Sequence, residues 1–224
     1  MAALPKAVDA PLGAGGQTVA ARTLLIACGA LAREIVELIR VNAWDHLTVS
    51  CLPAGWHNTP EKIPEGVRGR IRAARGSYDR ILVLYGDCGT GGTLDRVLAE
   101  EGVERIDGPH CYSFFAGAGV FDALAEAEIG TFYLTDYLAR HFERLIIEGL
   151  GLDRHPELRD LYFGNYTKLV YLAQTEDAEL TARAAAAAER LGLAFERHFT
   201  GYGELGQFLE TRGQEETEGA PWHS

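Results

Sequence analysis

The sequence predicts an α/β fold that is Rossmann-like: a mainly parallel sheet with helices on both faces. Short apolar runs alternate with amphipathic segments from Thr23 onward, and strands that alternate with helices of this length form βαβ units. The chain has 224 residues, of which 47% are hydrophobic and 24% charged, as in an ordinary globular protein. No apolar run approaches the roughly 20 residues that a membrane helix needs.

Each element follows from a local pattern. Apolar runs that end at Gly29, Pro53 and Gly86 predict strands, and apolar residues three and four positions apart predict the helices between them. The expected order is strand 23–29, helix 30–42, strand 46–53, loop 54–64, a helix 65–77 on the solvent side, strand 79–86, a glycine-rich turn, helix 93–102 capped by Thr93, an extended strand 104–114, helices 120–128 and 134–150, strand 165–175, helix 177–193, strand 194–201 and helix 202–210.

The domain organisation is expected to be simple. Residues 1–22 lack a basic start and a continuous apolar stretch, so we expect a flexible lead and not a secretory signal. Residues 23–210 are expected to form a single α/β domain, although the part after about Ile129 could pack as a partly separate half. Residues 211–224 are polar and acidic, and we expect a disordered tail.

Charge and cysteine content narrow the function classes. The formal net charge of −11 argues against a nucleic-acid or anionic-membrane partner. The four cysteines, without a secretory signal, predict a reducing cytoplasmic compartment in which disulfides are unlikely. They are Cys28, Cys51, Cys88 and Cys111, and none of them forms a C-x-x-C pair, so the common redox and zinc-finger spacings are absent.

The position of these cysteines is informative. Each lies at or just past the carboxyl end of a predicted strand, and ligands of open parallel sheets bind at that edge. Twenty-three residues separate Cys28 from Cys51, and the same number separates Cys88 from Cys111. The pairs Cys28-Gly29 and Cys88-Gly89 strengthen the similarity, which suggests a duplicated βαβ unit. Cys51 lies within a strand pattern, and we expect it to be a core thiol.

Cys28, Cys88 and Cys111 are the candidate metal ligands, with His110 or His57 as a fourth. Thiolates and imidazoles suit zinc and iron–sulfur clusters, and the residue types alone do not choose between them. Three cysteines from three loops could hold a cluster with one iron open to substrate. Three cysteines and one histidine could equally close a tetrahedral zinc site.

The segment from Tyr85 to Thr93 is a glycine-rich loop with two interpretations. Its backbone N–H groups could cradle a phosphate, although the loop matches neither the dinucleotide fingerprint nor the P-loop. Alternatively, glycine lets the backbone approach whatever Cys88 binds. Asp87 is a candidate proton carrier or a partner of a metal ligand, and also a common turn residue. The glycines assigned to cofactor binding are Gly29, Gly86, Gly89 and Gly91.

These segments resemble a known family. The succession CGALAREI, CLPAGWHNTP, YGDCGTGG, HCY and GTFYLTDYL is similar to the proteins catalogued as domain of unknown function number 1638, over about 23–195. The resemblance covers Cys28-Gly29, His57-Asn58, Cys88-Gly89, His110-Cys111 and Thr135-Asp136, and it leaves out Cys51. It implies an association with corrinoid-dependent methyltransferases of methylamine or betaine type, which by itself proves no chemistry.

Three functions remain open. The first is a metal-binding protein, an enzyme or an accessory factor, in corrinoid-dependent methyl transfer or one-carbon metabolism. The second is a non-catalytic module that binds a corrinoid or another small cofactor for a methyltransferase partner, with His57 or His110 as axial ligand. The third is a cysteine-nucleophile enzyme in which Cys88 or Cys111 attacks and a histidine acts as base. In the first, His57 and Asp87 are the candidate catalytic groups acting on a small-molecule substrate.

Overall fold

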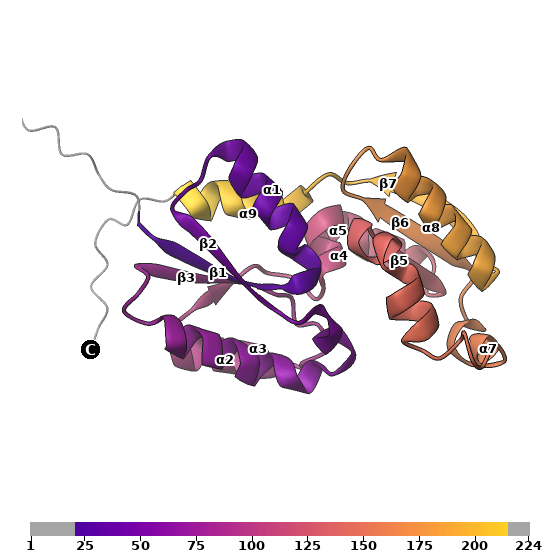
Figure 1. Cartoon of the computed structure of the whole chain (residues 1–224), viewed down its shortest axis with the longest axis horizontal. Coiled ribbons are helices and arrows are strands. Elements are labelled where there is room, and N and C mark those ends of the chain that lie inside the picture. Colours follow the sequence, from indigo (N-terminus) through magenta and orange to yellow (C-terminus); the bar gives the residue numbers. More distant parts are fainter. Residues whose placement is uncertain (1–20, 215–224) are drawn as a thin grey trace, which may run out of the picture.

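The computed structural model describes residues 21–214, and its strands form two parallel sheets. The four-stranded sheet has the order β2-β1-β3-β4, and the three-stranded sheet has the order β5-β6-β7. Every strand pair is parallel, with helical connections between strands (Figure 1). The prediction of a parallel α/β fold is therefore confirmed, and its strands are divided between two sheets.

The first sheet is built around two buried central strands. These are β1 (Thr23–Cys28) and β3 (Arg80–Leu84), flanked by β2 (Leu47–Leu52) and the short β4 (Glu104–Arg105). After a polar first residue, Thr23 and Arg80, both central strands are mainly apolar and buried on both faces, as parallel strands covered by helices must be. The chain runs from the central β1 to the edge strand β2, and again from the central β3 to the edge strand β4. This order is expected for two adjacent βαβ units that start at the centre of the sheet.

Helices cover both faces of this sheet (Figure 1). On one face α1 (Ala32–Asn42) and α9 (Gly203–Gln214) pack with the short α4 (Cys111–Ala116). On the other face lie α2 (Ile63–Ala74) and α3 (Thr93–Glu101). Two short 3-10 turns, η2 (Ala54–Asn58) and η3 (Pro60–Lys62), lead into α2. The segment predicted as the loop 54–64 is therefore largely helical turns.

Two local predictions are wrong. The helix α2 is not on the solvent side, because its Val67 and Ile71 side chains are completely buried against the sheet. The cap of α3 is Gly92 and not Thr93. The strand or extended segment that was expected to end near His110 and Cys111 pairs as a strand only at Glu104–Arg105, and α4 begins at Cys111.

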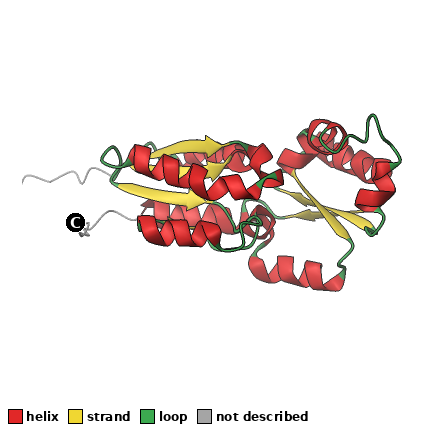
Figure 2. Cartoon of the chain, turned by 90° about the horizontal axis from the view of Figure 1, so that it is seen from below, coloured by secondary structure: helices red, strands yellow, loops and turns green. Residues whose placement is uncertain are grey.

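The second sheet has helices of its own. Its strands are β5 (Thr131–Thr135), β6 (Lys168–Ala173) and β7 (Ala194–Phe199). One face packs on α6 (Asp136–Arg140), a π-helical segment η4 (Glu143–Glu148), α7 (Leu158–Phe163) and α8 (Ala178–Leu191). The helix α5 (Ala118–Ala127) lies alone beneath the other face (Figure 2).

The sequence did not predict β5, and it predicted one helix over 134–150. The structure ends β5 at Thr135 and starts α6 at Asp136, with η4 beyond it. The capping interpretation of Thr135 is confirmed, because its hydroxyl accepts a hydrogen bond from Leu138 N at 3.4 Å.

The two sheets define two lobes. The first lobe comprises β1–β4 with α1–α4 and α9, and the second comprises β5–β7 with α5–α8 and η4. The prediction that 23–210 forms a single domain stays a prediction. Of the segments predicted to be flexible, 1–20 and 215–224 lie outside the described residues, while 211–214 belong to α9. No helix in the described part of the chain has the length and apolar character needed to cross a membrane.

Asp136 anchors the carboxyl end of the second sheet. Its side chain is completely buried. The carboxylate accepts hydrogen bonds from the Tyr171 hydroxyl at 2.7 Å, the Gln174 backbone N–H at 3.0 Å and the Thr175 hydroxyl at 2.6 Å. Arg140, one turn later, lies 3.5 Å away. A buried carboxylate with this many donors is satisfied, and it joins the ends of β5 and β6.

Asp136→Ala is expected to destabilise the protein by about 3–5 kcal/mol, because the buried donors and Arg140 lose their acceptor. Urea denaturation followed by circular dichroism measures this change. Asp153→Ala is the matched control, since Asp153 is exposed and its pair with Arg154 is worth little. A loss below about 1 kcal/mol for Asp136→Ala would show that the network is not structural.

Candidate functional site

The candidate site lies at the carboxyl edge of the first sheet, where two glycines let neighbouring loops touch. A Cβ at Gly29 would lie 3.0 Å from Leu52 O and 3.2 Å from Ala54 N. A Cβ at Gly86 would lie 2.8 Å from His110 N and 2.9 Å from Gly108 O. Side chains do not tolerate such distances, so these two predicted cofactor-binding glycines have a structural reason: close backbone approach.

The loop of Cys88 is fastened to the segment before Cys111. Cys88 N donates to Pro109 O at 2.9 Å, and Asp87 N donates to Gly108 O at 3.2 Å. Cys88 itself has a left-handed backbone, with φ of 49°, which is costly for a residue with a Cβ. These bonds hold the third and fourth strand ends together and bring Cys88 toward His110 and Cys111.

Cys28, Cys88 and Cys111 interact electrostatically. Burial is the largest cause that raises the pKa of each thiol, and neighbouring cysteines raise the pKa of Cys88 and Cys111 further. The charge of Cys28 acts on both other thiols, and that of Cys88 acts on Cys111. The pKa of Cys88 rises to about 11. The structure therefore brings the three predicted ligands together as neutral thiols.

Two buried polar atoms lie beside these thiols. His110 Nδ1 has no hydrogen-bond partner within the described residues. The Tyr85 hydroxyl, on a residue only 2% exposed, has no partner of good hydrogen-bond geometry there, but it interacts with the Cys28 thiol, which lowers the pKa of Cys28 and, after the larger effect of burial, raises that of Tyr85. An unsatisfied buried polar group costs about 1–3 kcal/mol, and such groups mark places where a partner is missing.

The two histidines lie near each other. Burial lowers the pKa of His110, and the charge of His57 lowers it further, while Asp87 opposes the shift. Burial also lowers the pKa of His57, although this residue is exposed overall. Both imidazoles are therefore held toward the neutral form that binds metals.

Asp87 forms hydrogen bonds within its own loop. Its carboxylate accepts hydrogen bonds from Gly92 N and the Thr90 hydroxyl, both at 2.8 Å, and from Gly91 N at 3.2 Å. These bonds, that of Gly92 first, lower the pKa of Asp87. The backbone N–H groups that were candidates to cradle a phosphate thus bind the chain's own carboxylate. A catalytic role of Asp87 stays a prediction.

The other glycines of the loop shape it. Gly89 and Gly91 have φ of 81° and 60°, conformations that glycine adopts without strain. The nearest atoms to a Cβ at Gly89 belong to the Pro60 ring, and the position at Gly91 is open. Their predicted contact with a cofactor is not needed to explain them.

Cys28 also raises the pKa of Cys51, after the larger effect of burial, but Cys51 has a different place in the fold. It lies inside β2, paired with Ala27, and packs against the core between β1, β3 and α1. This placement agrees with its interpretation as a core thiol.

Two charged residues at the site were missed by the sequence analysis. Glu34 of α1 is 4% exposed, and its Oε2 has no partner within the described residues. Its other oxygen lies 3.8 Å from Arg140 of α6. Burial raises the pKa of Glu34, and its charge acts on Cys111. An acidic residue among Leu31, Ile35 and Leu38 on the apolar face of a predicted helix was the available signal.

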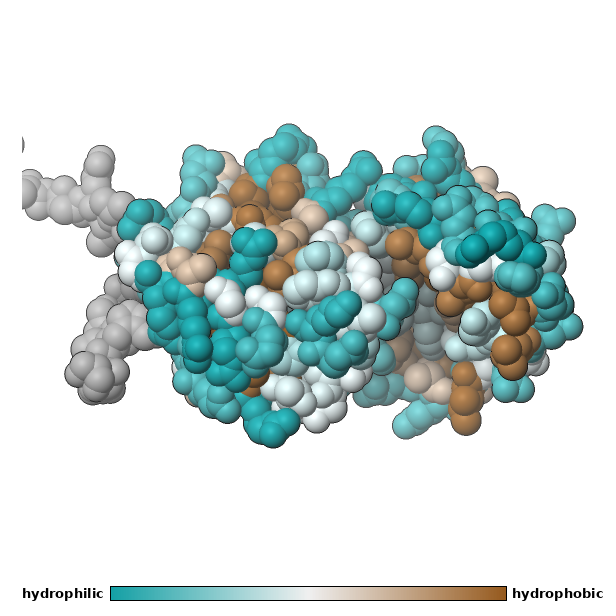
Figure 3. Space-filling view, turned by 60° about the horizontal axis from the view of Figure 1, so that its bottom comes forward, coloured by the Kyte–Doolittle hydropathy of each residue, from teal (hydrophilic) through white to brown (hydrophobic). Residues whose placement is uncertain are grey.

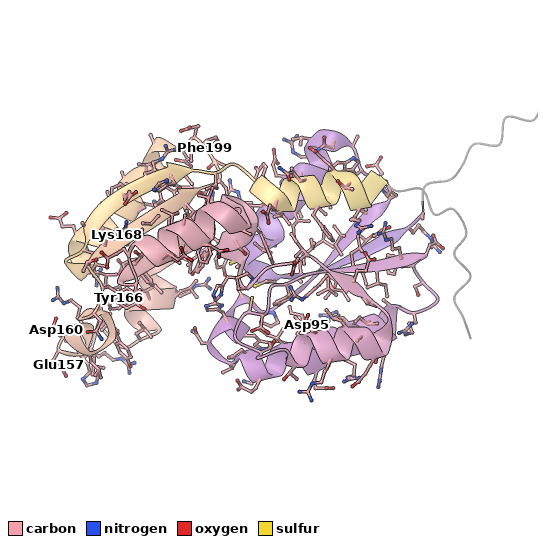
Figure 4. The ribbon with its side chains drawn as sticks, turned by 180° about the vertical axis from the view of Figure 1, so that it is seen from behind. Asp95, Glu157, Asp160, Tyr166, Lys168 and Phe199 are labelled. Atoms are coloured by element: carbon pink, nitrogen blue, oxygen red, sulfur yellow. The ribbon has the colours of Figure 1, made fainter. Side chains whose placement is uncertain are left out.

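The candidate metal ligands lie near one another, but their side chains do not surround a common point. Among residues 21–214, no three His, Cys, Asp or Glu side chains are positioned to hold a metal ion as they stand. The sulfur atoms drawn in yellow in Figure 4 lie near the middle of the molecule, where the lobes meet. Metal binding would require the thiol side chains to rotate toward one another.

Comparison with known proteins decides the family. The family model described as "Protein of unknown function (DUF1638)" matches residues 51–209, more than half of the chain. The chain belongs to the DUF1638 family. The match includes Cys88, His110 and Cys111 and begins after Cys28, so the first thiol lies outside it. No curated protein and no solved structure matches the chain.

Gly86→Ala is expected to destabilise the protein by about 1–3 kcal/mol, because the added methyl would press on the backbone at 108–110. Gly69→Ala is the control: Gly69 is exposed within α2 with nothing near its Cβ position, and this change should gain up to about 1 kcal/mol. Thermal or urea unfolding measures both. Equal stability of the Gly86→Ala variant and the wild type would contradict the close approach.

Alkylation of Cys88 is expected to be slow and to accelerate up to about pH 11. Only the thiolate reacts, and at pH 8 the raised pKa leaves it about a hundredfold rarer than in an ordinary thiol. A thiolate of higher pKa is also more nucleophilic, which raises the alkylation rate again by about tenfold. The net rate should therefore be about tenfold below that of the same cysteine in unfolded protein. Mass spectrometry after iodoacetamide pulses gives both rates. A folded-state rate above the unfolded one at pH 8 would favour the nucleophile hypothesis instead.

Proposed function

We propose that this DUF1638 protein binds a thiophilic metal centre, zinc or an iron–sulfur cluster, through Cys28, Cys88 and Cys111. The observation that carries the proposal is the convergence of three thiols, from the end of β1, the β3–α3 turn and the start of α4, beside His110 Nδ1, a buried polar atom without a partner among the described residues. His110 is the proposed fourth ligand, and His57 is the nearest alternative.

The electrostatics of the site support a cation. Three neighbouring thiols repel one another when they ionise, and burial adds a further penalty. A bound cation reverses both effects and makes the thiolate the favoured form. The raised thiol pKa values also count against an unaided cysteine nucleophile, which needs a lowered pKa.

The chemistry depends on which centre is bound. Zinc would act as a Lewis acid that deprotonates a bound thiol or water, and a cluster with one open iron would act as a Lewis acid or electron relay. The protein would contribute the thiolates, the neutral imidazole of His110 and a partly buried pocket. Asp87, held by its own loop, would keep that loop rigid.

We place this centre in corrinoid-dependent methyl transfer or one-carbon metabolism, as an enzyme or an accessory factor. This setting is inferred from the resemblance to the family and has no support in the geometry of the site. A substrate and a methyltransferase partner belong to the same inference.

One observation favours a second candidate, a non-catalytic module that binds a corrinoid. His57 is exposed with a lowered pKa, and a neutral, accessible imidazole is what an axial ligand requires. Cobalamin titration followed by absorbance separates the candidates. A spectral change lost in His57→Ala supports the corrinoid module, and no change with cobalamin counts against it.

The three single variants Cys28→Ala, Cys88→Ala and Cys111→Ala are each expected to lose most of the bound metal or cluster, because a thiolate is removed from the ligand set. Metal analysis and visible spectra after anaerobic and aerobic purification measure the loss. Cys51→Ala is the matched control and should keep the wild-type content. A colourless wild-type protein without stoichiometric metal under both conditions would refute the proposal.

A further inference from the structure

The chain passes between the lobes at two places, and glycine occupies both. The first crossing is Gly117, between α4 and α5, with φ of 81°. The second is the segment 200–202, between β7 and α9; Gly201 within it and Gly203, the first residue of α9, have φ of 58° and 48°. Phe199, the last residue of β7, lies at the end of the strand from which the chain runs to α9 (Figure 4). Short glycine-containing crossings are the usual form of an interdomain hinge.

The two crossings lie side by side. Ala118 N donates to Glu204 Oε1 at 2.9 Å, which joins the residue after the first crossing to the residue after the second. A Cβ at Gly203 would collide with the carbonyl oxygen of Phe115. Two adjacent crossings define one axis about which the lobes can turn without breaking either core.

A cavity of about 370 Å³ lies against these crossings. Its walls come from α4, α5, the ends of β6 and β7, and α9, and they include Phe115, Leu124, Leu172 and Gln207. This cavity is partly open to solvent, so the crossings have room to rearrange on that side.

The thiol site lies where the carboxyl edges of the two sheets meet. The turn η1 (Gly29–Leu31), directly after Cys28, contacts α6 of the second lobe. On the face shown in Figure 3 the surface is hollowed between the two parts of the molecule. The second lobe therefore covers part of the site that the first lobe builds.

One ion pair links the lobes at this edge. Arg140 of α6 lies 3.8 Å from Glu34 of α1, and their side chains are 17% and 4% exposed. The separation is too long for a hydrogen bond, and Glu34 keeps an unpartnered Oε2. The closed form keeps both charges away from water, so opening the lobes returns them to water, which offsets part of the attraction that is lost.

We propose that the lobes open and close about Gly117 and 201–203, that the structure is the closed form, and that the Arg140–Glu34 pair is its latch. Opening withdraws α6 from the Cys28 turn and admits the ligand of the thiol site. Closing buries that ligand between the carboxyl edges of the two sheets. The proposal concerns access and holds for any ligand, metal or organic.

Arg140→Gln tests the latch in the chelator-treated, metal-free full chain. Labelling of Cys28, Cys88 and Cys111 by a bulky maleimide should accelerate together by about fivefold, which corresponds to about 1 kcal/mol. Small-angle X-ray scattering should show a larger radius of gyration. Removal of the Arg140 guanidinium, a positive charge, can only raise a thiol pKa and so slow labelling. Faster labelling of Arg140→Gln therefore reports opening of the lobes and not a change in thiol pKa.

Two further variants make the test decisive. Glu34→Gln breaks the same pair from the first lobe and leaves Asp136 untouched, so it serves if Arg140→Gln does not fold. Because the charge of Glu34 itself raises the pKa of Cys111, the labelling rates of Cys28 and Cys88 are the readout in this variant. Glu34→Gln should also increase the radius of gyration. Arg183→Gln removes an ion pair within α8 and should change neither labelling nor size. Unchanged labelling and size in both latch variants would overturn the proposal, whatever the metal content of the wild type.

Discussion

The site depends on the fastening of the β3–α3 turn to the segment before α4. Cys88 N and Asp87 N donate to the carbonyls of Pro109 and Gly108, and Gly86 leaves room for this contact. Without it, Cys88 and Cys111 would belong to two independent loops. Backbone hydrogen bonds in a partly buried place are directional and leave no unpaired group, so they fix the relative position of the two thiols more firmly than side-chain packing does.

The strands β1, β2 and β3 could be predicted because each lies in a mainly apolar run with a clear stop, such as Gly29 or Pro53. The carboxyl-edge placement of Cys28 and Cys88 follows from that pattern and from the rule for parallel sheets. Cys111 reaches the same place by a different route. The strand β4 has only two residues, and the sequence 106–110 extends past it before α4 begins. An extended pattern read from residues alone does not reveal where strand pairing stops.

The division into two sheets was not predictable from local patterns. The five-residue strand β5 adjoins a strong helix cap at Thr135, and the cap signal extended the predicted helix backward over Leu134. Glu34 and Arg140 were missed for a related reason. Their roles depend on contacts between segments far apart in the chain, and only the tertiary structure determines which of these groups lacks a partner.

The central claim is that Cys28, Cys88 and Cys111 act as one ligand set. Anaerobic titration of the reduced, metal-free protein with Co²⁺ tests it most directly, because thiolate coordination produces an intense charge-transfer absorption that oxygen ligands do not. The account predicts saturation at one Co²⁺ per chain with a thiolate charge-transfer band and a release of protons on binding. A titration without a charge-transfer band, or one that Cys88→Ala leaves unchanged, would contradict it.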